Sequence, residues 1–198
     1  MEFKLIFGIA SSILAIVSFI PYIRDILKRK TEPHTYSWLI WTILQTVGVL
    51  AQFKEGAGYG AWALGIGAIF CFIIFLLSLK YGTKNISPFD TFCLFASAVT
   101  ILIYIGIENP VWAVISVAII DFVGFLPTFR KGFEEPFSET VSTFAMSGVA
   151  NVLSIIALQN YNVTTVFYIA TLFFTNFSFA SMILVRRNML KKITRPSI

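Results

Sequence analysis

The stretch Phe19-Ile20-Pro21-Tyr22-Ile23-Arg24 decides the expected fold, because a similar stretch, Phe125-Leu126-Pro127-Thr128-Phe129-Arg130, occurs 106 residues later. Each stretch ends a long apolar run and leads into a basic segment. A second match, Glu32-Pro33 with Glu135-Pro136, follows at an offset of 103 residues. The chain is therefore expected to contain two copies of one structural unit.

Composition indicates an integral membrane protein. Of the 198 residues, 57% are apolar and 13% are charged, whereas a soluble domain is roughly 45–50% apolar. The charged residues lie between long apolar runs, and a bilayer core needs about 20 apolar residues per helix. The sequence predicts an all-α integral membrane fold with seven transmembrane helices, at residues 3–24, 36–53, 59–79, 89–107, 110–130, 138–158 and 164–185. Ser87 before Pro88 and Asn109 before Pro110 are expected to cap the fourth and fifth helices.

The distribution of positive charge predicts the orientation of these helices. The segments after the first, third, fifth and seventh helices hold 13 of the 15 basic residues, and the other side holds only Lys4 and Lys54. Cytoplasmic loops carry the excess of Lys and Arg. We therefore expect a multi-pass protein with its N-terminus outside and its C-terminus in the cytoplasm. The net charge of +5 follows from this topology and from contact with membrane lipids, so no nucleic-acid partner is expected.

The repeat fixes how the seven helices are grouped. Residues 1–85 form the first three-helix unit and residues 109–198 the second, with a short basic tail. Three helices leave the chain on the opposite side of the membrane, so a linker helix at 86–108 must return it before the second unit begins. The sequence thus predicts two parallel three-helix bundles joined by a linker helix, a 3+1+3 arrangement.

This arrangement, with a proline dipeptide at the inner end of the first and fifth helices, resembles the PQ-loop superfamily. That superfamily includes SWEET and SemiSWEET sugar transporters, cystinosin-like amino-acid transporters and the KDEL receptor. The resemblance implies transport by alternating access, with Pro21 and Pro127 as hinges. An alternative from the residues alone is that both prolines simply end their helices. SWEET transporters bind sugar through an asparagine on the seventh helix, which the resemblance places at Asn176, and a partner on the third, where this chain has Phe70.

Asp121 is the most informative single residue, because it lies in the middle of the fifth apolar run. A carboxylate at that depth costs roughly 2.5–3.5 kcal/mol on insertion scales, so its partners are expected to be protein or water. Cystinosin-like relatives couple transport to protons through buried acids, which suggests a proton-carrying role for Asp121. The alternative is a structural aspartate that holds helices together.

Other polar residues on neighbouring helices are expected to line a solute site. Ser147 lies one helical turn before Asn151, and Trp41 one turn before Gln45, so each pair shares a helix face. An amide of the Asn176 type in hydrocarbon also serves to hold helices together. Trp38 lies near the inner boundary and is expected in the interfacial aromatic belt. His34 is expected to be solvated in a cytoplasmic loop.

The sequence therefore favours a transporter of a small polar solute, sugar-like or amino-acid-like, with facilitated and proton-coupled transport both open. Rival hypotheses are a seven-helix receptor of the KDEL-receptor type, which would need a basic cavity, and a structural membrane protein without cargo. There is no serine–histidine or cysteine–histidine pair at membrane depth, so an enzyme is not expected, and no cofactor or metal is indicated. A homo-oligomer is left open.

Overall fold

The computed structural model describes residues 2–106 and 110–193. These residues form seven α-helices and two short 3-10 helices: α1 (Glu2–Leu27), α2 (Thr35–Lys54), η1 (Gly58–Ala61), α3 (Trp62–Tyr81), α4 (Pro88–Ile105), α5 (Pro110–Glu134), η2 (Pro136–Ser138), α6 (Val141–Ala157) and α7 (Val163–Ile193). The expected end of the fourth span at residue 107, the expected helix cap at Asn109 and the tail from residue 194 lie outside the described residues.

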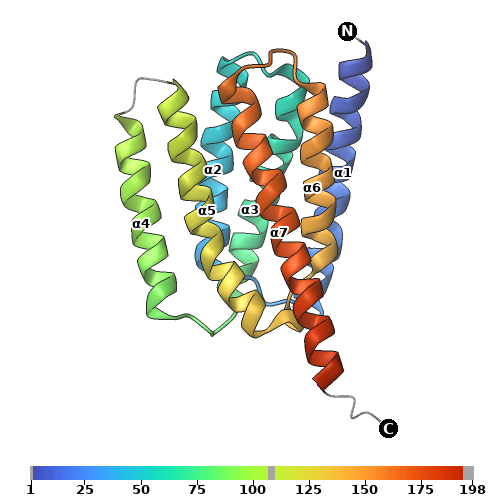
Figure 1. Cartoon of the computed structure of the whole chain (residues 1–198), viewed down its shortest axis with the longest axis vertical. Coiled ribbons are helices and arrows are strands. Elements are labelled where there is room, and N and C mark those ends of the chain that lie inside the picture. The colour runs from blue at the N-terminus through green and yellow to red at the C-terminus, as the bar shows by residue number, and fades with distance from the viewer. Residues whose placement is uncertain (1, 107–109, 194–198) are drawn as a thin grey trace.

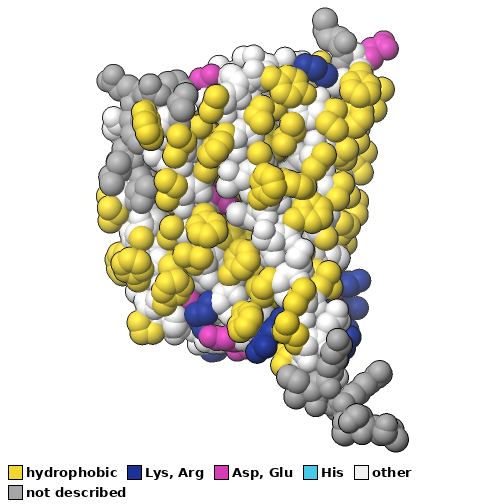
Figure 2. Space-filling model, in the orientation of Figure 1, with side chains coloured by type: hydrophobic (Ala, Val, Ile, Leu, Met, Phe, Trp, Pro, Cys, Tyr) yellow, Lys and Arg dark blue, Asp and Glu magenta, His cyan; other side chains and the backbone are white. Residues whose placement is uncertain are grey.

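The helices run side by side along the long axis of the molecule (Figure 1). α1, α3, α5 and α7 all finish at the same end, which we call the basic end because Lys and Arg gather there in Figure 2. The sequence explains this placement, because Arg24, Lys80 and Lys131 occupy the last turns of three of these helices.

Helix packing follows a pattern that occurs twice. α3 packs against α1 and α2, and α7 packs against α5 and α6. These groups are joined mainly where α1 packs against α6 and α2 against α5, with smaller contacts between α3 and α6 and between α2 and α7. α4 stands at one side of the bundle (Figure 1), where it packs against α5 and α2.

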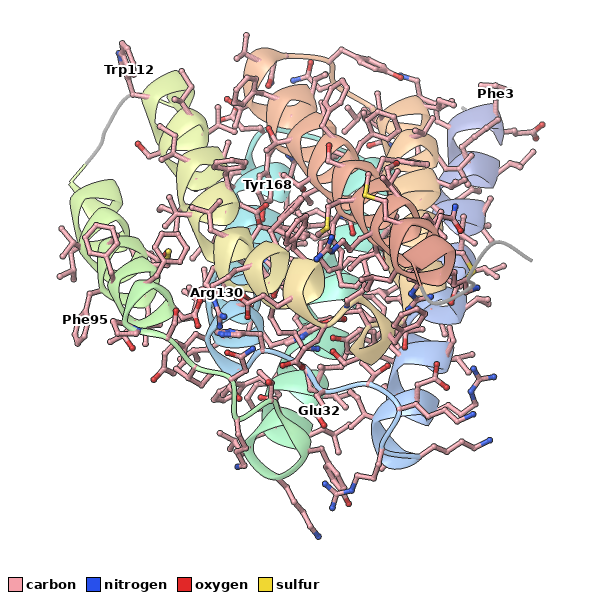
Figure 3. The ribbon with its side chains drawn as sticks, turned by 60° about the horizontal axis from the view of Figure 1, so that its bottom comes forward. Phe3, Glu32, Phe95, Trp112, Arg130 and Tyr168 are labelled. Atoms are coloured by element: carbon pink, nitrogen blue, oxygen red, sulfur yellow. The ribbon has the colours of Figure 1, made fainter. Side chains whose placement is uncertain are left out.

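The face of the molecule in Figure 2 is apolar over most of its height. Phe3 and Ile13 on α1 are 62% and 57% exposed, and Phe95 on α4, which points outward in Figure 3, is 65% exposed. Within residues 2–106 and 110–193, three helical stretches are long and apolar enough to cross a membrane: Glu2–Leu27, Gly58–Tyr81 and Val163–Lys191. Pro88–Val99 and Val141–Ala157 are apolar but shorter. The chain therefore has the helices and the surface of a membrane protein.

Local signals in the sequence explain where α4 begins. Pro88 is its first residue, and Ser87 and Asp90 form a reciprocal cap: the Asp90 N–H donates to Ser87 Oγ at 3.2 Å, and the Ser87 N–H donates to Asp90 Oδ2 at 2.7 Å. The expected cap at Ser87 is therefore confirmed.

Other boundaries differ from expectation. α6 begins at Val141 rather than residue 138, because Pro136–Ser138 form a separate 3-10 turn. α7 continues to Ile193 instead of ending near 185, because its polar last turns are good helix formers even where they are no longer apolar.

Both repeated prolines lie inside helices. α1 continues beyond Pro21 to Leu27, and α5 continues beyond Pro127 to Glu134. The alternative that these prolines end their helices is therefore wrong. Each proline removes one backbone hydrogen bond from a continuing helix, so each marks a weak point near the basic end.

Candidate functional site

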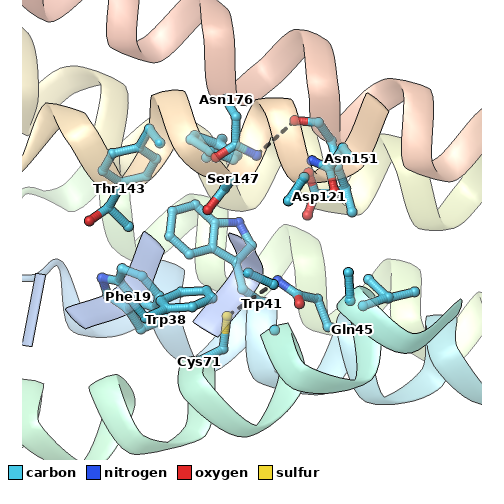
Figure 4. Close-up of a pocket in the computed structure, with 18 residues that line it drawn as sticks. Phe19, Trp38, Trp41, Gln45, Cys71, Asp121, Thr143, Ser147, Asn151 and Asn176 are labelled. Carbon is cyan, nitrogen blue, oxygen red and sulfur yellow. Dashed lines mark hydrogen bonds between the residues drawn. The ribbon is translucent and has the colours of Figure 1, made fainter. Parts of the chain in front are cut away.

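A cavity lies in the middle of the bundle between the two helix groups (Figure 4). α1, α2 and α3 line one side of it and α5, α6 and α7 the other, whereas α4 contributes none of the lining residues. Its volume is about 60 Å³, which suits several waters or a solute of a few heavy atoms, because one water needs roughly 10–15 Å³ on this measure.

The polar side of the cavity comes from α5, α6 and α7. α6 contributes Thr143, Ser147 and Asn151, which are spaced by four residues and therefore share one helix face. α5 contributes Asp121 and α7 contributes Asn176. Figure 4 shows these side chains converging on one space.

Asp121 is fully buried, and among the described residues neither of its carboxylate oxygens has a hydrogen-bond partner. None of the 18 residues that line the cavity is Lys, Arg or His. An unpaired carboxylate inside protein is costly, so a proton, water or a bound solute must balance it. The structure therefore leaves an uncompensated acid at the centre of the site.

The side of the cavity formed by α2 is aromatic, and we call its residues Trp38 and Trp41 the tryptophan wall. The Trp38 and Trp41 rings meet edge to face with centroids 5.0 Å apart, and Trp41 lies 4.4 Å from the ring of Phe125. Both tryptophans are more than nine-tenths buried. The Trp38 N–H interacts with the Tyr22 hydroxyl, whereas the Trp41 N–H lacks a hydrogen-bond acceptor among the described residues. Buried indole N–H groups usually find a partner, so the Trp41 donor is available to a ligand.

The remaining amides are held in different ways. Gln45 donates from Nε2 to the Cys71 sulfur at 3.2 Å, which leaves its oxygen free of that bond. A Cβ at Gly67 would clash with that oxygen, so glycine is required for the amide to lie where it does. Asn176 donates from Nδ2 to the Leu172 carbonyl at 2.7 Å.

The α6 side chains differ in how freely they face the cavity. The Ser147 hydroxyl lies 3.1 Å from that of Ser18 on α1, so it joins the two helix groups. The Thr143 hydroxyl is buried without a partner among the described residues, and Asn151 likewise makes no side-chain hydrogen bond within them. Together with Asp121, they leave the cavity with unmet donors and acceptors.

A buried ion pair closes the basic end beneath the cavity. Lys131 Nζ lies 2.9 Å from Glu139 Oε1, both side chains are fully buried, and the Tyr22 hydroxyl donates to Glu139 Oε2 at 3.2 Å. Tyr22 in turn packs on Trp38 and Phe144, with ring centroids 5.0 and 6.0 Å away. An aromatic layer therefore separates the cavity from the ion pair.

Further hydrogen bonds bind the same end together. Lys131 also donates to the carbonyls of Glu32 and Ser138, at 2.6 and 3.0 Å. Arg187 on α7 donates to the carbonyl of Glu139 at 2.6 Å. These bonds join the connection after α1 to α5, α6 and α7, so this end is closed by contacts between the two helix groups.

A second charged cluster attaches α4 at the basic end. Arg130 binds both carboxylate oxygens of Asp90, at 2.9 and 2.5 Å, and Figure 3 shows Arg130 at this end of α5. His34 Nε2 lies 3.4 Å from Asp90 Oδ2, and both side chains are fully buried. Burial lowers the pKa of His34 to about 4, although the Asp90 charge acts in the opposite direction.

At the opposite end, α2 is tied to the start of α7. Gln52 is buried and donates from Nε2 to the carbonyls of Thr164 and Thr165, at 3.2 and 3.1 Å. Gly48 lies against the Tyr168 ring, where a Cβ would come within 2.7 Å of that ring. Figure 3 shows Tyr168 inside the bundle.

The structure brings the expected site residues together. Six of them line this one cavity: Trp41, Gln45, Asp121, Ser147, Asn151 and Asn176. The two prolines lie toward the basic end of α1 and α5, outside the lining. Their roles in binding, proton coupling and hinge motion stay predictions.

Two expectations about other residues are wrong. Trp38 is not in an interfacial belt but is 2% exposed and lines the cavity, and His34 is not solvated but fully buried beside Asp90. Sequence reasoning also missed Thr143, although its four-residue spacing from Ser147 would have indicated it. Nothing local marked Lys131 and Glu139 as partners.

The chain matches no family model, no curated protein and no solved structure in searches of each kind.

Proposed function

We propose that this chain is a membrane transporter that carries a small polar solute by alternating access between two three-helix units, α1–α3 and α5–α7, with α4 as linker. The observation that carries this proposal is the cavity: three helices from each unit line it, and unpaired polar groups fill it inside an apolar bundle. Transporter sites lie near the bilayer midplane between repeats in this way.

The repeated packing supports the 3+1+3 arrangement with seven spans. Under exchange of α1 for α5, α2 for α6 and α3 for α7, each contact within one unit has its counterpart in the other. The α1–α6 contact likewise becomes the α5–α2 contact. A rocking motion of one unit against the other would then open the two ends in turn, with the basic end toward the cytoplasm.

A receptor of the KDEL-receptor type is less well supported. Such a receptor would need cationic side chains in its cavity to bind a peptide carboxylate, and none of the 18 lining residues is Lys or Arg. A cargo-free structural role does not explain why buried donors and acceptors face a hollow.

The native cysteines allow a test that needs no knowledge of the solute. Cys71 lines the cavity, and Cys93 on α4 is the second of only two cysteines. In a Cys93→Ser background, Cys71 is labelled with a membrane-impermeant methanethiosulfonate applied from either side of oriented vesicles. Alternating access predicts labelling from both sides.

A variant of the basic end separates a carrier from a channel. Glu139→Gln removes one charge of the buried pair, while Lys131 keeps its two carbonyl acceptors. The state closed at the basic end loses stability, and each ~1.4 kcal/mol shifts the two states by about tenfold. Labelling should accelerate from the basic end and slow from the opposite end. Acceleration without slowing indicates a channel, and unchanged rates from both sides contradict the proposal.

A further inference from the structure

We propose that the cavity selects a small organic cation, such as a primary ammonium, held between the Asp121 carboxylate and the tryptophan wall. This inference rests on the proposed function, because it names the chemical class of the carried solute. Its starting point is the charge balance of the site, where Asp121 is the only charged group among the 18 lining residues.

The carboxylate lacks any partner that would neutralise it within the described structure. It is fully buried and both of its oxygens are unpaired. The titratable neighbours that interact with it electrostatically are the Cys71 thiol on α3 and the Tyr168 hydroxyl on α7, and neither carries positive charge. The Lys131 ammonium is occupied by Glu139 below the aromatic layer. A cationic solute would supply the missing charge.

The opposing wall suits a cation as well. Trp41 and Phe125 lie 4.4 Å apart, and Trp38 meets Trp41 edge to face, so several ring faces and edges border the same space. Aromatic faces attract cations, and Trp does so most strongly. An anionic solute would meet the Asp121 charge in a low-dielectric space, where like charges repel strongly.

The cavity lining also indicates which polar group the solute carries besides its cation. Asn151, Thr143 and the Trp41 indole N–H offer hydrogen bonds that no described residue uses. A hydroxyl or amide on the solute would satisfy them. The volume of about 60 Å³ limits the solute to a few heavy atoms in this conformation. Ethanolammonium, with an ammonium and a hydroxyl two carbons apart, is a probe of the right size.

Three probes of similar size and different charge test this inference: ethanolammonium, neutral ethylene glycol and anionic glycolate. The thermal unfolding midpoint of the detergent-purified protein is measured with each at neutral pH. Ethanolammonium at ten times its dissociation constant should raise Tm by about 3–6 °C, and the other two should not. Equal shifts for ethylene glycol and ethanolammonium would overturn the inference.

Two variants test whether the Tm shift with ethanolammonium depends on the charge of Asp121. Asp121→Asn keeps the shape of the side chain and should abolish the ethanolammonium shift. Glu55→Gln removes the same charge at the opposite end of the bundle, outside the lining, and should keep the shift. An ethanolammonium shift that survives in Asp121→Asn contradicts the inference.

A measurement on the unchanged cavity covers the case in which Asp121→Asn does not fold. With Cys93→Ser, Cys71 is modified by 2-aminoethyl and by 2-sulfonatoethyl methanethiosulfonate, and the rate ratio is compared with that of a free small thiol. The cationic reagent should be favoured by about tenfold or more over the small-thiol ratio. A ratio equal to or below the small-thiol value refutes cation selection.

The outcomes separate this inference from the proposed function. Reciprocal labelling in Glu139→Gln does not depend on solute charge. If labelling accelerates at the basic end and slows at the other, but the cavity shows no charge selectivity, only the inference of a cationic solute is contradicted. Charge-selective binding without reciprocal labelling leaves a cation site in a protein that does not transport.

Discussion

Helices α1–α3 and helices α5–α7 contribute unequally to the cavity, although the sequences of the proposed units align. At the offsets of 106 and 103 residues, two lining positions are aromatic in both units: Phe19 with Phe125, and Trp41 with Phe144. At other positions the second unit is polar where the first has a small or apolar residue: Asp121 against Ala15, Asn151 against Gly48, and Asn176 against Phe70. The sequence repeat thus accompanies a repeated packing pattern, while the recognition groups differ: residues 109–198 supply the acid and most of the polar side chains, and residues 1–85 supply Gln45 and the two tryptophans.

The same inequality occurs at the basic end, where α4 covers only the α2–α5 side. Arg130 and His34 both contact the buried Asp90 of α4. Their counterparts are exposed: the Arg24 side chain is 58% exposed and Phe137 is 55% exposed. The position of α4 therefore places two aligned positions of the sequence in different environments.

The largest expected effect compares the two arginines of the repeated stretch. Arg130→Ala leaves Asp90 buried without its bidentate partner and should lower the free energy of unfolding by about 3–5 kcal/mol. Arg24→Ala removes an exposed pair with Asp25 and should cost about 0.5 kcal/mol or less. Chemical unfolding in detergent measures both. Equal losses in the two variants would show that α4 is not attached through Asp90.

The next prediction moves the acid from one unit to the other. Asp121→Ala should weaken ethanolammonium binding on the order of 100-fold, because a buried charge partner is lost. Adding Ala15→Asp places a carboxylate at the aligned position on the facing wall, which also lines the cavity. Calorimetric titration should show partial recovery of binding in the double variant. No recovery, in a double variant that folds, would mean that position as well as charge determines recognition.

The buried His34 predicts how stability depends on pH. Its pKa is about 4 in the folded protein and about 6.5 when unfolded, so the unfolded state binds protons more tightly between these values. The free energy of unfolding should therefore fall by about 1 kcal/mol as pH drops from about 6.5 to 5.5. His34→Gln should remove this slope. A slope that persists in His34→Gln must come from another group.

The smallest expected effect is a change in ethanolammonium affinity when Trp41 or its aligned residue Phe144 is replaced. Trp41→Phe makes the two units alike at this position, and it removes an unpaired indole N–H and the stronger cation–π surface. Ethanolammonium affinity should fall about three- to tenfold. The matched change Phe144→Leu, which keeps an apolar side chain on the other unit, should alter affinity less. A larger loss of affinity from Phe144→Leu than from Trp41→Phe would contradict the assignment of the cation-binding surface to the tryptophan wall.

Much of this arrangement could be predicted from local sequence. The apolar runs predicted the positions of all seven helices, and Ser87 predicted the start of α4, because caps and hydropathy act over a few residues. The four-residue spacings of Trp41 with Gln45 and of Ser147 with Asn151 predicted shared faces, and all four residues line the cavity. Periodicity fixes which residues share a helix face.

The errors concern contacts between segments far apart in the chain. Depth in the membrane suggested a belt position for Trp38, but the rotation of α2 turns it inward toward Tyr22 of α1. His34 lies in a polar connection, and in the folded protein it is buried against Asp90 of α4, far from it in sequence. The sequence places Lys131 among the basic residues of the loop after the fifth helix. Its partner Glu139 follows a turn, and local propensity does not predict the geometry of that turn.

Alternating access itself is tested most directly by distances at the two ends of the bundle. Spin labels at Lys28 and Phe133 report the basic end, and labels at Lys54 and Tyr161 report the opposite end, with one exposed residue from each unit in every pair. Double electron–electron resonance in lipid nanodiscs measures both distance distributions, in the wild-type background and in Glu139→Gln.

Two distance populations are predicted at each end, and Glu139→Gln should shift them in opposite directions, longer at the basic end and shorter at the other. A single unchanged distance at both ends, or both ends lengthening together, would contradict transport by alternating access.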